Sequence, residues 1–437
     1  MNALIERIRS SQAVIGIIGQ GYVGLPLALV FAEAGFPVIG LDLDEHKVDM
    51  LNRGESYIKH IGSERVAAAL AAGRFRASTN FEELSACDAV LICVPTPLGH
   101  HREPDLSFVL DSARAVAKHL RKGQLVVLES TTYPGTTDED VLPVLEATGL
   151  KTPGDFLLAF SPEREDPGNP KFHTKIIPKV VGGVNAPSTE AAVALYERAI
   201  DKVVAVSSAR VAESSKLLEN IFRSVNIALV NELKMTFDRM GIDVWEVIEA
   251  AKTKPFGFTP FYPGPGLGGH CIPLDPFYLS WKAAEYGIWT RFIELAGEIN
   301  THMPRYVVDR TVKALNEAGK SILGAKVLVL GLAYKENIDD DRESPSYEII
   351  ELLREAGAEV AYCDPFFPTA RPGRKHDLQM ASVPCTAESF GAHDAVLLST
   401  GHAPFRDPAL YAKVGLLIDT RNAVRVPEGS KTRVVKA

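Results

Sequence analysis

Cys271 is the residue in this chain whose surroundings most favour covalent chemistry. It ends the segment 263–271 (PGPGLGGHC), in which four glycines and two prolines predict a shaped loop. Asp275 and Pro276 are expected as the N-cap and first residue of a helix, so the thiol would lie near a helix N-terminus, which favours the thiolate. The glycines would clear space for a ligand. The competing interpretations are a small buried apolar cysteine and an Asp275 that only caps a helix.

Two further groups of polar side chains have spacings that suit chemistry. Lys216 and Asn220 are four residues apart in a helical pattern and share one face, where they would orient an oxyanion or an alcohol. The pattern alone favours two solvated side chains. The acidic loop 161–168 (SPEREDPG) follows an expected strand end, so it is either a charged loop or a general base with its neighbours. His100 and His101 are expected as a solvated pair, and no HExxH motif or serine triad occurs.

A glycine motif near the N-terminus predicts a dinucleotide site. The first expected strand runs into GQGYVG, in which Gly19 permits the tight turn, Gly21 lets backbone approach a pyrophosphate, and Gly24 allows close packing of helix on strand. Asp42 ends the second strand, where an acid binds the ribose diol and repels a 2′-phosphate, so NAD is favoured over NADP. The alternatives are a glycine turn without a cofactor and, for Lys47, a solvated lysine instead of a neighbour of the adenine.

The C-terminal part of the chain repeats this organisation without the glycine motif. Segment 392–400 (AHDAVLLST) matches 87–96 (CDAVLICVPT) and follows the first strand of its own domain in the same order. After the expected strand 326–330 only one glycine remains, and Lys335 and Arg342 follow it. Such a Rossmann-like domain would bind a different nucleotide near these cations. The alternative is a solvated surface loop.

The elements that must position these residues follow from alternating apolar runs and helical patterns. A helix is expected over 22–34, stopped by Gly35, between the first two strands. Alternation of strands and helices predicts a parallel sheet with helices on both faces. The buried strands expected in the first domain are 14–19, 36–41, 89–94, 125–128 and 156–160.

Two long helical patterns separate the two α/β parts. Residues 209–240 contain no proline or glycine, which predicts a helix on the order of 45 Å that spans a whole domain. A second helical stretch, 289–318, is expected to be interrupted at Pro304. The expected fold class is α/β, with two Rossmann-like doubly wound domains joined by a long central helix and an all-α middle domain that carries a dimer interface. The expected domains are 1–207, 208–318 and 319–437.

Composition excludes several classes of protein. The chain has 437 residues, enough for two or three domains. Its formal net charge is −8 without a basic tract, so neither nucleic acid nor an anionic membrane is expected as a partner. Five cysteines without CxxC spacing indicate no disulfide framework and no zinc knuckle. The charged N-terminus and the short apolar runs predict a cytoplasmic protein without a signal peptide or membrane insertion.

Taken together, these motifs resemble those of the UDP-glucose/GDP-mannose dehydrogenase family over essentially the whole chain. The family implies an N-terminal NAD domain, a central dimerising helix and a C-terminal UDP-binding domain. NAD is therefore the expected cofactor, a UDP-sugar the expected substrate and a homodimer or higher homo-oligomer the expected assembly, with no metal. The matching segments are 19–27 (GQGYVGLPL), 93–97 (CVPTP), 129–132 (ESTT), 213–220 (ESSKLLEN), 264–275 (GPGLGGHCIPLD) and 331–344 (GLAYKENIDDDRES).

The resemblance implies a four-electron oxidation of the sugar C6 alcohol to a carboxylate, with two NAD. A first hydride transfer gives an aldehyde, which the Cys271 thiolate captures as a thiohemiacetal. A second hydride transfer gives a thioester, which water hydrolyses. A nucleophile is required because a bound aldehyde donates hydride only after a nucleophile has added to it.

The same resemblance implies the roles of single residues. Lys216 and Asn220 would stabilise the developing oxyanion. Glu163 would be the base for thioester hydrolysis, with Thr131 positioning water and Asp275 supporting the cysteine site. Further cofactor contacts are expected at Tyr22, Val23, Thr96, Ser130, Thr131 and Glu165, and further substrate contacts at Glu163, Arg164, Lys216, Asn220, Tyr262, Gly266, Gly268, Lys335 and Arg342.

The motifs SPERxxPG, GGHCIP and DPFYL resemble the branch of the family that oxidises UDP-N-acetylhexosamines, especially UDP-N-acetyl-D-glucosamine. The glucose branch usually carries a lysine where this chain has Leu274, and an upstream arginine where this chain offers Lys252 and Lys254. These departures leave open which residue recognises the acetamido group. The alternatives are a UDP-glucose, UDP-N-acetylmannosamine or UDP-N-acetylgalactosamine dehydrogenase, a one-step NAD alcohol dehydrogenase with a structural Cys271, and a nucleotide-sensing protein without turnover.

Overall fold

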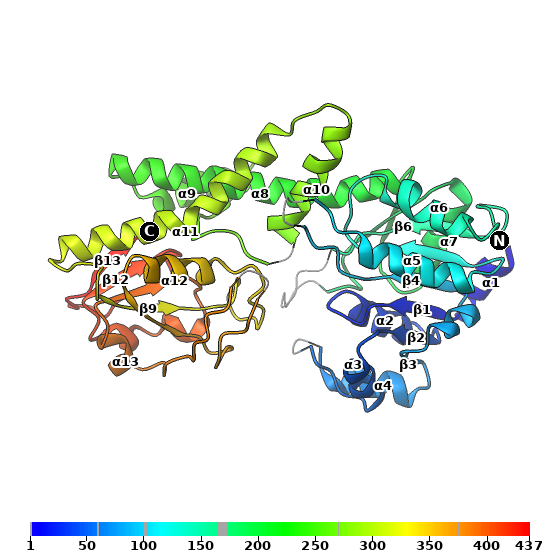
Figure 1. Cartoon of the computed structure of the whole chain (residues 1–437), viewed down its shortest axis with the longest axis horizontal. Coiled ribbons are helices and arrows are strands. Elements are labelled where there is room, and N and C mark those ends of the chain that lie inside the picture. The colour runs from blue at the N-terminus through cyan, green and yellow to red at the C-terminus, as the bar shows by residue number, and fades with distance from the viewer. Residues whose placement is uncertain (1, 59–60, 100–102, 165–172, 270, 374–375) are drawn as a thin grey trace. The chain divides into compact units, whose positions relative to one another are not determined.

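The computed structural model divides the chain into two compact units. It describes residues 2–58, 61–99, 103–164, 173–269, 271–373 and 376–437. The N-terminal unit comprises residues 1–219 and 277–289, and the C-terminal unit comprises 220–276 and 290–437. Two helices, α8 (Ala209–Met240) and α10 (Cys271–Glu285), have residues in both units. Each unit is built around a sheet of its own (Figure 1).

An eight-stranded sheet in the order β3-β2-β1-β4-β5-β6-β7-β8 forms the centre of the N-terminal unit. Its neighbouring strands are parallel except for β6 and β7. The strand order reverses between β1 and β4, and open α/β sheets bind ligands at the carboxyl ends of such strands. The strands are β1 (Ile15–Ile18), β2 (Val38–Leu41), β3 (Phe75–Ser78), β4 (Ala89–Ile92), β5 (Leu125–Leu128), β6 (Leu157–Phe160), β7 (Lys179–Gly183) and β8 (Val203–Ala205).

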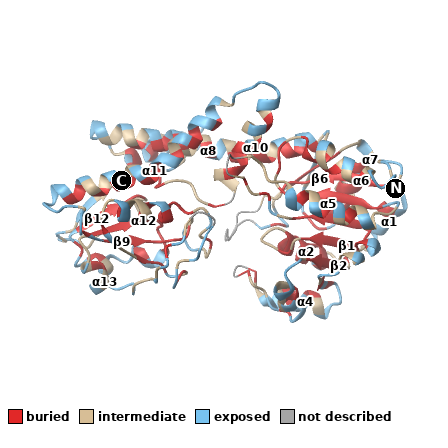
Figure 2. Ribbon diagram, viewed as in Figure 1, coloured by how far each residue is buried: buried red, intermediate tan, exposed pale blue. Residues whose placement is uncertain are grey.

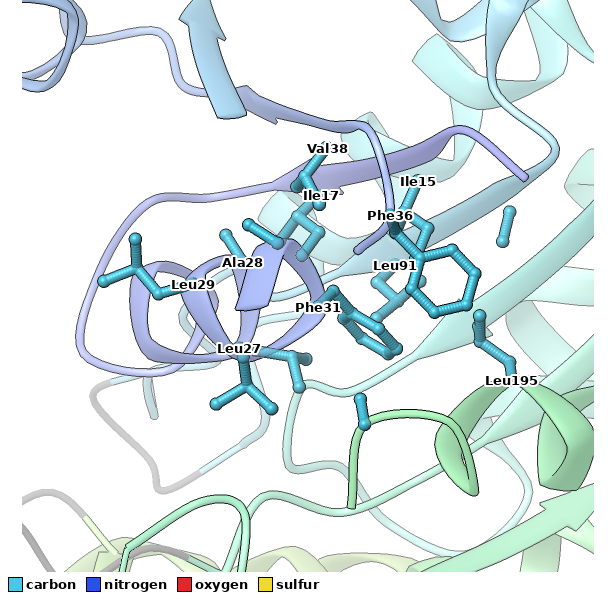
Figure 3. Close-up of a cluster of buried hydrophobic side chains, with 14 of the residues drawn as sticks. Ile15, Ile17, Leu27, Ala28, Leu29, Phe31, Phe36, Val38, Leu91 and Leu195 are labelled. Atoms are coloured by element: carbon cyan, nitrogen blue, oxygen red, sulfur yellow. The ribbon is translucent and has the colours of Figure 1, made fainter. Parts of the chain in front are cut away.

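Alternate residues of the central strands supply two hydrophobic clusters of this unit. Ile15 and Ile17 of β1 pack with Phe31 of α2, and these side chains lie together in Figure 3. Ile18, on the opposite side of the same strand, packs in a second cluster with Val109 of α5. The helices are α1 (Asn2–Arg9), α2 (Gly24–Glu33), α3 (Glu45–Asn52), α4 (Ser63–Ala71), α5 (Ser107–His119), α6 (Leu142–Glu146) and α7 (Ala186–Tyr196), with a 3-10 helix at Phe81–Ala86 and a π-helix at Thr136–Val141.

A five-stranded parallel sheet in the order β10-β9-β11-β12-β13 forms the α/β part of the C-terminal unit. Its order also reverses between two strands, β9 and β11. Most strand residues of both sheets are buried, whereas the outer helix surfaces are exposed (Figure 2). The elements are β9 (Lys326–Leu330), β10 (Glu359–Cys363), β11 (Ala395–Leu398), β12 (Leu416–Asp419), β13 (Arg433–Lys436), α12 (Pro345–Glu355), α13 (Ala387–Gly391), and 3-10 helices at Ala403–Arg406 and Pro408–Tyr411.

The helical part of the C-terminal unit consists of the C-terminal portion of α8, α9 (Val244–Lys252) and α11 (Arg291–Glu317). The interruption expected at Pro304 is wrong, because α11 runs through it. Pro304 removes one intrahelical hydrogen bond, but buried neighbours on the same helix, such as Val307 and Val308, fix the helix by packing. None of the described helices combines the length and the apolar character needed to span a bilayer.

The expected fold class is confirmed, with two Rossmann-like parallel-sheet domains and a helical middle region. The helix expected over 22–34 begins at Gly24 and ends at Glu33. Strands β3, β7 and β8 were not expected from the sequence: β3 alternates buried with exposed residues, β7 contains two glycines, and β8 has only three residues. The division into 1–207, 208–318 and 319–437 stays a prediction.

Candidate active site

The glycine motif after β1 leaves open space at one position. Gly19 has a φ of +89°, and a Cβ there would approach the carbonyl oxygen of Cys93 to 2.5 Å. A Cβ at Gly24 would approach the carbonyl oxygen of Gly19 to 1.8 Å, so α2 packs tightly on the turn. A Cβ at Gly21, in contrast, would meet nothing within 4 Å. Gly21 thus offers bare backbone beside a helix N-terminus, which suits a pyrophosphate.

Asp42 follows the neighbouring strand β2, and its carboxylate is hydrogen-bonded to the backbone of the glycine motif. Its Oδ2 accepts the backbone N–H of Gln20 at 2.8 Å, and its Oδ1 accepts the N–H of Asp44 at 3.0 Å. Nζ of Lys47 lies 3.8 Å from the Asp42 carboxylate. Asp42 is only partly buried, so its carboxylate stays accessible to a ribose diol, and these residues fit NAD.

The loops after β4 and β5 are joined by side-chain hydrogen bonds. Thr96 is buried, and its hydroxyl donates to the carbonyl oxygen of Thr131 at 2.6 Å. Ser130 donates to the carbonyl oxygen of Val94 at 2.7 Å and accepts the N–H of the same residue. The three polar residues expected at the cofactor from these two loops are therefore adjacent at the carboxyl edge of the sheet.

Not every expected cofactor residue can be placed. Tyr22 and Val23 lie in the turn that precedes α2, where both are partly buried. Glu165 lies outside the described residues, as do His100 and His101.

Thr132 is a polar residue of this edge that the sequence interpretation missed. It is 1% exposed, and its hydroxyl oxygen has no hydrogen-bond partner among the described residues. Thr131, which the resemblance singled out, is partly buried. A buried hydroxyl without a partner is costly in a folded protein, so Thr132 has the property expected of a group that binds water or ligand. Nothing in the sequence distinguishes Thr132 from the adjacent Thr131.

Glu163 lies three residues after the end of β6, and both its side chain and its backbone carbonyl have partners. Its Oε1 accepts the N–H of Arg164 at 2.6 Å, and its Oε2 lies 3.3 Å from Nζ of Lys179. Lys216 of α8 is buried and donates a hydrogen bond to the Glu163 carbonyl oxygen. The N-terminal unit therefore brings together Glu163 and Lys216, while Arg164 pairs with Glu219 at 2.7 Å.

Helix α10 begins at Cys271, earlier than expected. Asp275 and Pro276 lie inside this helix, so the prediction that they form its N-cap and first residue is wrong. The physical reason is that the Asp275 carboxylate is engaged with a side chain of another helix, and α10 tolerates a proline that removes one hydrogen bond. Cys271 itself is partly exposed at the helix N-terminus, where the helix dipole favours a thiolate.

Asn220 is the side chain that engages Asp275. Its Nδ2 donates to Oδ2 of Asp275 at 2.5 Å, both side chains are fully buried, and Arg223 donates to the Asn220 amide oxygen. Asn220 therefore acts on the cysteine helix through Asp275. The role expected for Asn220 at a substrate oxyanion stays a prediction.

The glycine-rich loop before Cys271 packs against loops of the C-terminal sheet. A Cβ at Gly264 would approach Nη1 of Arg421 to 2.4 Å, and one at Gly268 would approach Cβ of Tyr334 to 2.4 Å. Gly266 has a φ of +137°, which a side chain would strain. The glycines thus allow the loop to pack closely against the protein itself. This explanation of the glycines differs from the ligand space that the sequence suggested.

Three residues expected at the substrate have protein partners in the C-terminal unit. Nη2 of Arg342 lies 2.6 Å from the carboxylate of Asp340. Lys335 is partly buried in the loop after β9. The hydroxyl of Tyr262 donates to Glu249 at 2.7 Å.

Arg421 is a cation that the sequence interpretation missed. It follows β12, and its Nε donates to the carbonyl oxygen of Ser399, which follows β11, at 2.8 Å. Neither terminal nitrogen has a hydrogen bond or carboxylate partner among the described residues, and burial lowers the pKa of Arg421 to about 10. The charges of Glu336 and Asp419 oppose this lowering, but neither carboxylate pairs directly with the terminal nitrogens. A guanidinium with such free donors at the carboxyl edge of a parallel sheet suits an anionic ligand.

The described residues contain no group of three or more His, Cys, Asp or Glu side chains that would hold a metal ion. Among the described residues, the C-terminal unit supplies the partly exposed Cys271, the Asn220 amide, the Asp275 carboxylate and the Arg421 guanidinium, and the N-terminal unit supplies the Lys216 ammonium and the Glu163 carboxylate. This set suits nucleophilic and acid–base chemistry.

Sequence profiles of the UDP-glucose/GDP-mannose dehydrogenase family match three successive parts of the chain. The NAD binding domain matches residues 13–200, the central domain residues 210–302 and the UDP binding domain residues 328–426. NAD is thus the cofactor of this chain.

Named relatives share most of their length with the chain. UDP-N-acetyl-D-glucosamine 6-dehydrogenase of Pseudomonas aeruginosa is 36% identical over 90% of this chain and 91% of its own. NDP-N-acetyl-D-galactosaminuronic acid dehydrogenase of Ralstonia nicotianae is 40% identical over 78% and 79%. The solved structure of a UDP-D-ManNAc dehydrogenase from Pyrococcus horikoshii has a TM-score of 0.87 at 33% identity, covering 97% of this chain and 99% of that one. The chain belongs to the UDP-glucose/GDP-mannose dehydrogenase family.

Proposed function

We propose that this member of the family oxidises the C6 alcohol of a UDP-N-acetylhexosamine to a carboxylate through a thiohemiacetal and a thioester on Cys271. The observation that carries this proposal is the partly exposed thiol at the first residue of α10. The Cys271 thiolate adds to the aldehyde carbon. The resulting thiohemiacetal carries a C–H bond from which a hydride can be transferred. NAD, which the glycine motif and Asp42 would hold, would supply the hydride acceptor for the two oxidation steps.

The residues of the chain then act on the substrate and on water. The Lys216 ammonium stabilises the negative oxygen that forms when the thiolate adds. Glu163 takes a proton from the water that attacks the thioester carbon, and the thiolate of Cys271 leaves as the carboxylate forms. Asn220 supports this chemistry through Asp275, since the two side chains are joined by a hydrogen bond. The buried hydroxyl of Thr132 favours this residue for the water-positioning role that the resemblance implied for Thr131.

At the nucleotide end, the proposed contacts are cationic and aromatic. Arg421 is available to bind a phosphate because its terminal nitrogens have no other partner among the described residues. Arg342 and Lys335 remain proposed contacts, and Arg342 also pairs with Asp340. Tyr262, Gly266 and Gly268 stay proposed substrate contacts.

UDP-N-acetyl-D-glucosamine is the proposed substrate, supported by the name of the P. aeruginosa relative and by the SPERxxPG motif. The relatives named UDP-N-acetyl-D-mannosamine dehydrogenase and NDP-N-acetyl-D-galactosaminuronic acid dehydrogenase give the competing candidates. Initial rates of NADH formation with UDP-glucose, UDP-N-acetylglucosamine, UDP-N-acetylmannosamine and UDP-N-acetylgalactosamine separate them. The highest kcat/KM is expected for UDP-N-acetylglucosamine, and a preference for UDP-glucose would overturn the choice.

A homodimer is the proposed assembly, and a cytoplasmic location remains a prediction. The support for the dimer is a stripe of exposed apolar side chains on α8 whose members are seven, four and seven residues apart, so that they share one face. They are Val211, Leu218, Phe222 and Leu229. Light scattering of the purified protein tests this, and a monomer at micromolar concentration would refute it.

A further inference from the structure

A buried cluster of charges lies behind Glu163 in the N-terminal unit. Lys179 begins β7, and its side chain is 4% exposed. Its Nζ lies 2.6 Å from Oε2 of Glu129, which follows β5, and 3.3 Å from Oε2 of Glu163. Tyr196 of α7 donates its hydroxyl to the other oxygen of Glu129. One ammonium group thus bridges the ends of two neighbouring strands.

Stability alone does not account for this cluster. Taking charges out of water costs several kcal/mol per ion, and apolar side chains of similar size often give an equally stable core. The cluster also has two carboxylates for one ammonium, so its charges do not balance when both are ionised. Because the cluster is costly and adjoins Glu163, we expect it to serve the function of Glu163.

The contacts of Glu163 indicate how the cluster acts on its carboxylate. Oε1 accepts the N–H of Arg164, and Oε2 faces the ammonium of Lys179, so both carboxylate oxygens have fixed directions. Lys179 is in turn fixed by Glu129, which Tyr196 holds. A base acts on water efficiently only when it is ionised and correctly placed, and Lys179 provides both conditions.

We propose that Lys179 is a positioning residue that keeps the Glu163 carboxylate ionised and aimed at the hydrolytic water, with Glu129 as its buried anchor. This proposal rests on the proposed function, in which Glu163 is the base for thioester hydrolysis. In this role Lys179 contacts neither substrate nor water and acts only through Glu163.

The charges that face the cluster support the assignment. Burial raises the pKa of Glu129 to about 7, although the charge of Lys179 works in the opposite direction. Burial would lower the pKa of Lys179, but Glu129 and Glu163 outweigh it and raise the value, so Lys179 stays charged. Among the described residues, the Lys216 ammonium also faces Glu163, at its backbone carbonyl oxygen. Cys93 and Tyr196 face the cluster too, and burial raises the pKa of both well above the usual values, so they stay neutral.

The test is a pair of variants at this position, Lys179→Met and Lys179→Arg, with pre-steady-state and steady-state readouts. Lys179→Met should keep the rapid formation of two NADH per site, since Glu163 has no part in hydride transfer. It should lower kcat about 10- to 100-fold, because a misplaced or protonated base slows hydrolysis. The thioester should accumulate on Cys271 in intact-protein mass spectra, and the acidic limb of the pH–rate profile should move to higher pH. Lys179→Arg should restore most of kcat and the original limb.

Two further variants keep the proposal falsifiable. Lys122→Met, on a lysine whose side chain is 76% exposed, is the control for the substitution and should match the wild type. The double variant Glu129→Gln/Lys179→Met removes both buried charges, so it should fold even where Lys179→Met does not. A double variant that forms acid at the wild-type rate, or a folded Lys179→Met with an unchanged pH profile, would overturn the proposal. Failure of the wild type to form NADH with any UDP-sugar would instead refute the proposed function.

Discussion

The side-chain amide of Asn220 donates a hydrogen bond of 2.5 Å to the carboxylate of Asp275, and both side chains are fully buried. The bond joins α8 to the first turns of α10, the helix that begins at Cys271. The orientation of the cysteine helix is thus tied to a residue 55 positions earlier in the chain. This tie gives Asn220 a role in holding the nucleophile, in addition to any contact with substrate.

Asn220→Ala should lower both stability and turnover. Removing the donor takes one hydrogen bond from a buried carboxylate, at a cost of about 1–3 kcal/mol. Thermal unfolding measures the stability, and the rate of thiol labelling at Cys271 reports on the cysteine helix. Asn226→Ala is the matched control, since Asn226 is on the same helix and binds only the backbone of Phe222. Equal effects of the two variants would contradict this role.

Thr132→Val should leave stability unchanged or slightly higher, because the hydroxyl that it removes has no partner among the described residues. The same variant should lower kcat, with thioester accumulation, if the hydroxyl orients the hydrolytic water. Thr131→Val is the comparison, and steady-state rates of acid formation decide between them. A larger loss of kcat in Thr131→Val would return the role to Thr131.

Arg421→Leu should raise KM for the UDP-sugar about 10- to 100-fold, the worth of one or two charge-assisted hydrogen bonds. It should leave the melting temperature nearly unchanged, since only Nε has a protein acceptor. Titration calorimetry with UDP alone should give the same loss of affinity. Arg342→Leu should raise KM less, because Arg342 already pairs with Asp340. An unchanged KM in Arg421→Leu would contradict the phosphate contact.

Asp364 should make the C-terminal unit sensitive to acid. Burial alone would raise its pKa, but His402 and the backbone N–H groups of Phe366 and Leu332 outweigh burial and lower it from 3.8. A carboxyl group with a lowered folded-state pKa contributes stability above its unfolded value, and this stability is lost as the pH falls below about 4. Asp364→Asn should therefore be less stable at pH 7, with a shallower loss on acidification. Urea unfolding between pH 3 and 7 measures this, and Asp111→Asn, at an exposed aspartate, is the control.

The parts of the structure that sequence predicted best depend on local conformation. The turn at Gly19 and the packing at Gly24 follow from steric limits within one strand–turn–helix unit, so GQGYVG predicted them. The start of α10 was missed because the expected cap, Asp275, binds Asn220 on another helix. The continuity of α11 through Pro304 was missed because packing outweighs the local preference.

The site residues that sequence missed depend on contacts between distant segments. Lys179 and Glu129 are 50 positions apart, and no motif connects them. Arg421 becomes conspicuous only when its terminal nitrogens are found without a hydrogen-bond acceptor among the described residues. Polar residues of this kind carry no periodicity or spacing, so only the folded chain separates them from solvated surface residues.

The covalent role of Cys271 is tested most directly by rapid quenching of enzyme mixed with NAD and UDP-N-acetylglucosamine, with intact-protein mass and NADH measured together. The wild type should form two NADH per molecule of acid and carry a transient adduct on Cys271. Cys271→Ser should form no acid at a comparable rate. Wild-type acid formation by Cys271→Ser, or one NADH per sugar with an aldehyde product, would contradict the account.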